Sequence, residues 1–223
     1  MVVATGDNFG SLDAFDMVMD AYRPFLSYPG AFVLGSNDYY SPIPKPWTRY
    51  LMRSTPPPAR VVPDLPYLPM VRQMRDAGWV DLSNASGTLS LPGGTVSLLG
   101  TDDAHIFRDR MVAPASSWEE PGALRLGITH APYTRVVSAL TSEGADLILA
   151  GHTHGGQIGI PGMGAIITNC DIARHYAKGL NRWEAPDGSQ AWLHVSAGLG
   201  TSPHAKVRIA TRPEASLIHV HPA

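Results

Sequence analysis

The sequence has almost no cysteine and no long hydrophobic run. Its one cysteine, Cys170, excludes a framework of intrachain disulfides and fits a reducing compartment, although many exported bacterial proteins also lack disulfides. No apolar segment approaches the roughly 20 residues that a membrane-spanning helix needs, and the first residues do not have the pattern of a signal peptide. We therefore expect a protein of the cytoplasm, or one that binds peripherally at the inner face of the membrane.

A large excess of charge is also missing. The net charge of -2 at neutral pH gives no reason to expect nucleic acid or an anionic membrane as a partner. Hydrophobic residues make up 44% and charged residues 16% of the chain, which is the composition of a folded soluble protein. A chain of 223 residues is most simply one domain, spanning 1–223, and it can bury a substantial core.

Short apolar runs alternate with stretches of helical periodicity. At the start, runs at 1–5 and 31–34 flank apolar residues at helical spacing over 12–26, with Ser11 as a candidate N-cap, which predicts a strand–helix–strand unit. The remaining expected elements are helices over 65–77 and 133–142, a hairpin of 88–91 with 95–99, and strands over 124–129, 147–150, 191–195 and 215–220. This alternation indicates an α/β fold.

Two other segments lack such a pattern. The 20 prolines are concentrated in 41–69, where we expect a long ordered loop because proline prevents regular strand pairing. Residues 155–181 are rich in glycine and are expected to be irregular. The proline-rich loop holds the apolar residues Trp47, Tyr50, Leu51 and Met52. They would suit a lid over a lipid-like substrate, although a loop that packs on its own domain would contain the same residue types.

The most informative stretch of the chain is Gly151-His152-Thr153-His154-Gly155-Gly156-Gln157. The apolar run 147–150 precedes it, so the two histidines follow directly on a buried strand. A turn of this kind can aim two imidazoles at one point, and imidazole is the commonest protein ligand for zinc, iron and manganese. We therefore expect His152 and His154 to bind metal.

Three other strand-end turns carry metal-ligating side chains, namely Asp7, Asn37 and His130. Each has an ordinary explanation by itself: Asp7 and Asn37 could be turn formers, and His130 could be a packed histidine. Together with His152 and His154 they form a ligand set of oxygen and nitrogen without thiolate, which suits manganese, iron or zinc in a hydrolase better than a structural zinc site. A carboxylate can bridge two ions about 3.5–4 Å apart, a common device in phosphoester hydrolysis.

In order and approximate spacing, these residues resemble the motifs of the calcineurin-like metallophosphoesterases. The stretches that carry the resemblance are Gly6-Asp7-Asn8, Gly35-Ser36-Asn37-Asp38, His130 and Gly151-His152-Thr153-His154. The extension Gly155-Gly156-Gln157-Ile158 resembles the branch that includes bacterial membrane-associated phosphodiesterases, some of which act on UDP-diacylglucosamine-type lipids.

The resemblance implies a four-layer α-β-β-α sandwich with a centre of two divalent metal ions. Asp7 would be the carboxylate that bridges the ions, His130 and His152 would bind the second ion, and His154 would bind the first. The bridging hydroxide would attack phosphorus in line, without a covalent enzyme intermediate. Binding to a metal lowers the pKa of water, for zinc from about 15.7 towards about 7, which makes hydroxide available near neutral pH.

The chain departs from the family at its start. The family opens with an Asp-x-His turn on an upstream strand, which supplies two ligands of the first ion, and no such turn precedes Asp7. We therefore expect an N-terminally truncated sandwich that binds one ion or none, with the strand edge of Val2–Thr5 exposed and with lower solubility and stability than an extended version. A misplaced start and a protein with an incomplete first metal site are both consistent with this departure.

A second departure lies in Gly35-Ser36-Asn37-Asp38. The family has Gly-Asn-His-Asp or Gly-Asn-His-Glu, in which the Asn binds the second metal and the His assists as an acid or a transition-state stabiliser. A strict alignment puts Ser36 in the ligand position and Asn37 in the acid position, whereas a small backbone shift would let Asn37 bind metal. Asn cannot act as a general acid, so water or another histidine would protonate the leaving group, with His105 and His204 as candidates.

The sequence therefore supports two main hypotheses of function. The first is a metallophosphoesterase that hydrolyses phosphomonoesters or phosphodiesters, on a small-molecule substrate that is lipid-linked or a nucleotide sugar. The second is a catalytically impaired binding module with an incomplete metal site. An unrelated α/β protein with coincidental histidines is a third interpretation. Arg208 and Lys206 could contact a phosphate, or they could be solvated charges of a strand.

Overall fold

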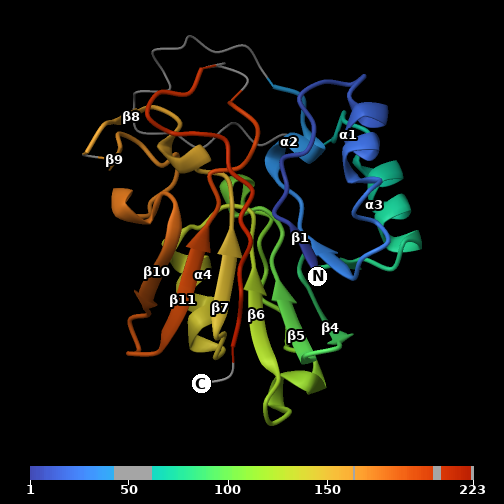
Figure 1. Ribbon diagram of the computed structural model, residues 1–223, viewed down its shortest axis with the longest axis vertical. Coiled ribbons are helices and arrows are strands. Elements are labelled where there is room, and N and C mark those ends of the chain that lie inside the picture. The colour runs from blue at the N-terminus through green and yellow to red at the C-terminus, as the bar shows by residue number, and fades with distance from the viewer. Residues whose placement is uncertain (43–61, 163, 203–206, 222–223) are drawn as a thin grey trace.

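The computed structural model describes residues 1–42, 62–162, 164–202 and 207–221, and it is a mixed α/β structure with two main sheets (Figure 1). The lid residues expected at 47 and 50–52, as well as His204 and Lys206, lie outside the described residues. Among the helices that are described, none is long and apolar enough to cross a membrane.

The larger sheet has six strands in the order β10-β11-β7-β6-β5-β4. Its centre is parallel, with β5 beside β6, β6 beside β7 and β7 beside β11, and an antiparallel strand closes each edge. The six strands are β4 (Ala85–Leu91), β5 (Gly94–Gly100), β6 (Leu124–Ile128), β7 (Leu147–Ala150), β10 (Gly179–Glu184) and β11 (Gln190–Val195). Because the central strands are parallel, the turns that follow β5, β6 and β7 lie at the same end of the sheet.

The smaller sheet has three parallel strands in the order β1-β2-β3. These are β1 (Val2–Ala4), β2 (Gly30–Phe32) and β3 (Val80–Asp81). The helix α1 (Phe15–Tyr22) connects β1 to β2, while the short helix α2 (Ser36–Tyr39) and then α3 (Tyr67–Asp76) follow β2. As expected for an edge strand, β1 pairs with β2 on one side. A separate pair of two-residue strands, β8 (Gly159–Ile160) and β9 (Gly164–Ala165), lies near the His-x-His turn in sequence.

Three clusters of buried apolar side chains connect these elements. The first joins the larger sheet to α4 (Thr134–Ser142), with Leu140 against Ile148. The second joins the smaller sheet to α1 and α3 and contains Phe32 and Met70. The third lies between the two sheets and contains Val33. The first two clusters therefore each place helices against one sheet, and the third contains residues of both sheets.

Most of the expected elements are present, and three expectations were wrong in whole or in part. Residues 215–220 are not a strand: the segment runs without ladder pairing, and its Ile218 packs against the core between the sheets. Residues 179–181, the end of the stretch expected to be irregular, belong to β10 (Gly179–Glu184), whose single buried side chain is Trp183. The first helix is shorter than 12–26 and starts after Ala14 instead of Ser11.

Packing between the two sheets predicts a large effect of a truncation at Leu98. This side chain of β5 is 0% exposed in the cluster between the sheets. We expect Leu98→Ala to lower the free energy of unfolding by about 2–5 kcal/mol, because the cavity is enclosed on both sides. Leu180→Ala is the matched control, since Leu180 on β10 is 53% exposed, and it should change stability by less than about 0.5 kcal/mol. Equal effects in denaturant-induced unfolding would contradict this packing.

Candidate metal centre

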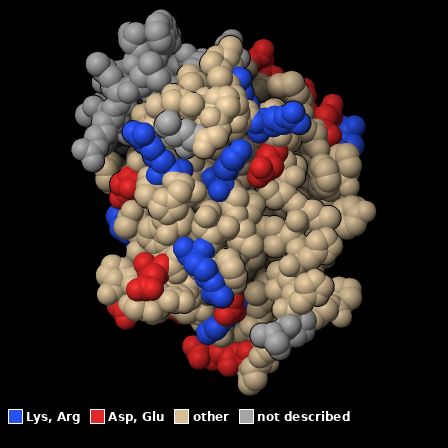
Figure 2. Space-filling model, turned by 60° about the vertical axis from the view of Figure 1, so that its left-hand side comes forward, with Lys and Arg blue, Asp and Glu red and all other residues tan. Residues whose placement is uncertain are grey.

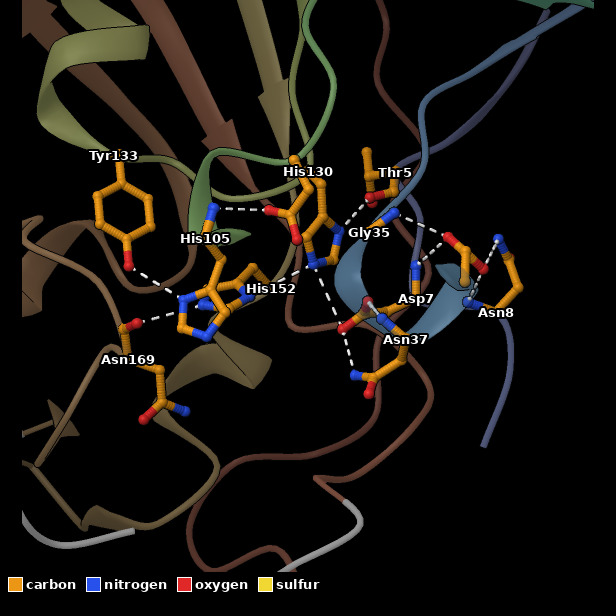
Figure 3. A network of polar contacts seen from close by, with 12 residues as sticks. Thr5, Asp7, Asn8, Gly35, Asn37, His105, His130, Tyr133, His152 and Asn169 are labelled. Carbon is orange, nitrogen blue, oxygen red and sulfur yellow. Dashed lines mark hydrogen bonds and ion pairs between the residues drawn. The ribbon is translucent and has the colours of Figure 1, made fainter. Parts of the chain in front are cut away.

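Four strand-end turns from both sheets meet at one place (Figure 3). Asp7 follows β1 and Asn37 lies in α2 after β2, so both come from the smaller sheet. His130 follows β6 and His152 follows β7 of the larger sheet. The inner packing of the two sheets is what brings these two pairs of turns together, because neither sheet carries all four residues.

Asp7, His130 and His152 form a compact group of potential metal ligands. The distance from His130 Nε2 to Asp7 Oδ2 is 3.3 Å, and the distance from His130 Nε2 to His152 Nδ1 is also 3.3 Å. One ligand atom from each of the three residues lies within 4.8 Å of the other two. Figure 3 shows His130 between Asp7 on one side and His152 on the other.

Asn37 belongs to the same cluster through its bonds to Asp7. Its backbone N–H donates to Asp7 Oδ1 and its side-chain Nδ2 donates to Asp7 Oδ2, both at 2.8 Å. The carboxylate of Asp7 is thus held by two hydrogen bonds from one residue of α2. Asn37 therefore lies in the site, while Ser36, the strict counterpart of the family's ligand, starts α2 at a half-buried position.

The outer ring nitrogens of both histidines contact main-chain carbonyls. His130 Nδ1 lies 2.6 Å from the carbonyl oxygen of Thr5, and His152 Nε2 lies 3.2 Å from that of Asn169. A neutral imidazole has one N–H and one lone pair, and only an N–H can donate to a carbonyl. In the neutral rings, the lone pairs of His130 Nε2 and His152 Nδ1 therefore face each other, and they repel unless a proton or a cation lies between them.

This arrangement fits a divalent metal ion. Histidines that bind metals almost always donate their other ring N–H to a carbonyl or carboxylate, which fixes the tautomer and the direction of the free lone pair. Both histidines have such a partner, and the carboxylate of Asp7 adds an oxygen ligand beside them. Asp7, His130 and His152 would hold the ion.

The charges of the site favour a cation as well. Burial alone would raise the pKa of Asp7, but the neighbouring His130 outweighs burial and holds this pKa well below its usual range. Burial alone would lower the pKa of His130, whereas the carboxylates of Asp7 and Asp103 raise it to about 10. Burial, followed by the nearby His105 and His130, holds the pKa of His152 well below its ordinary value. Without metal, one proton on His130 therefore takes the place of the cation.

Asp38 ties the two turns of the smaller sheet together. Its buried carboxylate accepts hydrogen bonds from the backbone N–H groups of Asp7, Asn8 and Gly35 at 2.8–2.9 Å. Burial, and then the charge of Asp7, raises the pKa of Asp38 to about 6, although the bonds from Gly35 and Asn8 act in the opposite direction. This anchoring role went unrecognised in the sequence, where Asp38 is only the last residue of a motif.

His154 lies apart from the three-residue group, although it follows the same strand. Its ligand atoms do not lie within 4.8 Å of those of all three residues, and burial lowers its pKa. Both His152 and His154 have a left-handed backbone, with φ of 66° and 50°, which is uncommon for residues other than glycine. The turn therefore needs support from the surrounding chain.

The segment after residue 207 supplies that support. The guanidinium of Arg208 donates to the carbonyl oxygens of His154 at 3.1 Å, Ala197 at 2.8 Å and Gly198 at 3.0 Å, and also to Gly200. The buried side chain of Gln157 donates to Val207 and accepts from the N–H of Ser202. Arg208 is thus neither a solvated strand charge nor a residue free for phosphate, because it holds the loops around the His-x-His turn.

Two further polar residues lie beside the cluster. The ring centroid of His105 is 4.7 Å from that of His152, and its Nδ1 is 3.0 Å from the hydroxyl of Tyr133. Asp103 is fully buried, its Oδ2 has no hydrogen-bond partner among the described residues, and burial raises its pKa to about 7. His105 was a candidate from its strand-end position, whereas Asp103 was missed, although it lies in the same turn.

Comparison with known proteins finds two curated relatives. The chain is 28% identical over 147 residues to phosphodiesterase YaeI of Escherichia coli (strain K12), which covers 66% of this chain and 49% of that protein. It is 27% identical over 145 residues to the uncharacterized metallophosphoesterase YkoQ of Bacillus subtilis (strain 168), which covers 64% of this chain and 50% of that protein. The chain therefore spans about half the length of the curated relatives it matches.

No family model and no solved structure matches the chain. The printed names of the two relatives are those of a phosphodiesterase and of a metallophosphoesterase. The ligand group of Asp7, His130 and His152 agrees with metal use.

A methyl group at Gly35 would disrupt the candidate centre. A Cβ at this position would lie 2.3 Å from Asp7 Oδ1 and 2.7 Å from His130 Cε1, whereas a Cβ at Gly10 would have nothing within 4 Å. We expect Gly35→Ala to reduce the affinity for Mn²⁺ or Zn²⁺ by at least about tenfold, and Gly10→Ala to leave it unchanged. Metal titration of both variants measures this effect, and equal affinities would contradict the geometry.

The pKa of His130 predicts that metal binding depends on pH. Because this imidazole holds a proton up to about pH 10 in the metal-free protein, an ion must displace that proton. The apparent affinity should therefore increase as pH rises, by up to about tenfold per pH unit between about pH 6 and pH 9, with the release of about one proton per ion. Calorimetric titration in buffers of different ionisation enthalpy measures the released protons. An affinity that does not change with pH would show that His130 is not a ligand.

Proposed function

We propose that this chain is the metal-binding core of a phosphoesterase that hydrolyses phosphomonoesters or phosphodiesters. The observation that carries the proposal is the pair of imidazole nitrogens of His130 and His152, which face each other at 3.3 Å beside the carboxylate of Asp7. The printed names of the two relatives, a phosphodiesterase and a metallophosphoesterase, point to the same chemistry.

We further propose the four-layer α-β-β-α sandwich and a centre of two divalent ions. The three apolar clusters, which lie outside the smaller sheet, between the sheets and outside the larger sheet, support the four layers. Asp7, His130 and His152 would hold one ion with Asn37, whose amide needs only to turn over to present Oδ1 instead of Nδ2. Asp7 would also bridge to a second ion with His154. Oxygen and nitrogen ligands without thiolate favour manganese, iron or zinc.

The residues of the site suit phosphoryl chemistry in several ways. When bound, divalent ions lower the pKa of a coordinated water and neutralise the charge of the phosphoryl oxygens. The low pKa of Asp7 keeps its carboxylate ionised at every physiological pH. The carbonyls of Thr5 and Asn169 hold the two imidazoles in the tautomer that points a lone pair inward. Asn37 cannot transfer a proton, so water or His105, whose ring packs on His152, would protonate the leaving group.

The substrate is proposed as a small phosphoester, either lipid-linked or a nucleotide sugar. The net charge of -2 does not favour nucleic acid. A lipid-linked substrate would bring the protein into peripheral contact with the inner face of a membrane from the cytoplasm.

A pair of histidine variants tests the proposal. We expect His152→Ala to remove at least one bound ion and to lower the hydrolysis of bis(p-nitrophenyl) phosphate by about 100-fold or more, because loss of a ligand costs at least as much as loss of its supporting partner. The exposed His219 provides the control, and His219→Ala should change neither quantity. Metal analysis and initial rates measure both, and a His152→Ala protein with full metal and full activity would disprove the assignment.

The position of His154 favours one alternative, a binding module without turnover. Its ligand atoms lie outside the three-residue group, so a second ion would have few ligands among the described residues. The same experiment separates the two functions. One bound ion without hydrolysis in the unmodified chain would identify the binding module, while two ions with turnover would identify the hydrolase.

A further inference from the structure

A cavity lies next to the His-x-His turn. It has a volume of about 560 Å³, and its wall includes the glycines Gly155 and Gly164 and the side chains of Arg174, His175 and Lys178. A Cβ placed on Gly164 would have no atom within 4 Å, so this part of the wall faces open space. None of these residues belongs to the metal-ligand group described above.

The cavity is physically attached to the metal centre. Thr153, between the two histidines of the turn, donates a hydrogen bond of 2.6 Å to the carbonyl oxygen of Ala177. The side chain of Lys178 passes close to Gly155, since its Cδ would be 3.3 Å from a Cβ on that glycine. Asn169, earlier in the same segment, contacts His152 through its carbonyl oxygen. Residues 169–178, which include Arg174 and Lys178, are therefore held against the turn near both of their ends.

The lining of the cavity is positively charged. Arg174, His175 and Lys178 are exposed, and no Asp or Glu is among the lining residues. Within the described part of the chain, neither Arg174 nor Lys178 forms an ion pair. Figure 2 brings the side of β8, β9 and β10 forward and shows Lys and Arg side chains close together on the upper half of this face, with Asp and Glu side chains beside them. The cavity therefore offers positive charge to an anion without competition from a carboxylate in its own wall.

We propose that this cavity is an accessory anion subsite that binds a second phosphate group of the substrate, separate from the phosphate that is hydrolysed. The inference rests on the proposed function, because it assigns the reacting phosphate to the metal centre. The planar guanidinium of Arg174 suits two oxygens of one phosphate, and Lys178 adds a compact positive charge. The substrate class is thus a phosphoester that carries another phosphate group some distance along the molecule.

A matched pair of substrates tests this inference. Thymidine 5′-(p-nitrophenyl phosphate) and the same compound with an added 3′-phosphate differ only in the second phosphate. We expect the unmodified protein to prefer the 3′-phosphorylated compound in kcat/KM, mainly through KM. Arg174→Gln and Lys178→Gln should each reduce that preference by roughly tenfold and leave kcat/KM for the compound without 3′-phosphate within about twofold, since neither residue belongs to the metal centre.

Arg72→Gln is the matched control, because Arg72 is an exposed arginine on α3, which packs on the other sheet. It makes the same change of net charge and should preserve the preference when the ionic strength is held constant. An equal loss in Arg72→Gln would show a general charge effect and would overturn the subsite. An unmodified protein that hydrolyses both compounds equally well would also overturn it.

A binding measurement separates failure of the subsite from failure of the proposed function. Thymidine 3′,5′-bisphosphate and inorganic phosphate are titrated calorimetrically into protein kept free of metal with EDTA. In metal-free protein only the cavity would hold a phosphate group, so bisphosphate binding that weakens in Arg174→Gln but not in Arg72→Gln supports the subsite, even if the chain hydrolyses neither substrate. Bisphosphate binding that Arg174→Gln leaves unchanged would place the anion elsewhere, and no binding of either ligand would mean no anion site. Both results would overturn the inference while leaving hydrolysis at the metal centre possible.

Discussion

Two imidazoles that face each other at 3.3 Å are the constraint on which the rest of the site depends. Their outer nitrogens contact the carbonyls of Thr5 and Asn169, so neither ring can turn away without losing a hydrogen bond. The repulsion between the inner lone pairs can be relieved only by a positive charge between them. Asp7 lies at the point where that charge would be stabilised, and this explains why its carboxylate is held so firmly by Asn37.

The two sheets supply different parts of the site. The larger sheet supplies the imidazoles from neighbouring parallel strands, β6 and β7, whose ends are aligned by the ladder between them. The smaller sheet supplies the carboxylate, and Asp38 fixes the turn of Asp7 to the start of α2 through three backbone N–H groups. The partly buried carboxylate of Asp7 and the buried carboxyl groups of Asp38 and Asp103 lie in and beside this cluster, and burial raises the pKa of Asp38 and of Asp103. A cation would offset the cost of burying such groups in their ionised form.

The sequence predicted correctly those site residues that can be recognised from their position directly after a strand. Strand-end turns with Asp7, Asn37, His130 and His152 could be found because parallel strands present their carboxyl ends at one edge, and the structure brings these four together. The contacts of Thr5 and Asn169 could not be found in this way, because a carbonyl oxygen is the same in every residue. The strand expected at 215–220 is absent because Ile218 packs against the core between the sheets, and an apolar run does not reveal whether it pairs or only packs.

The roles of charged side chains were harder to infer than their positions. Arg208 looked like a surface charge because nothing near it in sequence marks the two loops whose carbonyls it binds. Arg174 and Lys178 lie in a stretch without a motif, and only the fold places them beside Thr153 and Gly155. Long cationic side chains can reach partners in many directions, so their sequence neighbours say little about their targets.

The hydrogen bond between His130 and Thr5 has a consequence for the order of assembly. It joins residues separated by 125 positions, and it closes only when the two sheets have docked. A polypeptide loop of this length is entropically costly to close before other contacts form. The complete group of three ligands would therefore form only once the two sheets have docked, because Asp7 comes from one sheet and both histidines from the other. Before docking, an ion would find at most the two imidazoles of the larger sheet.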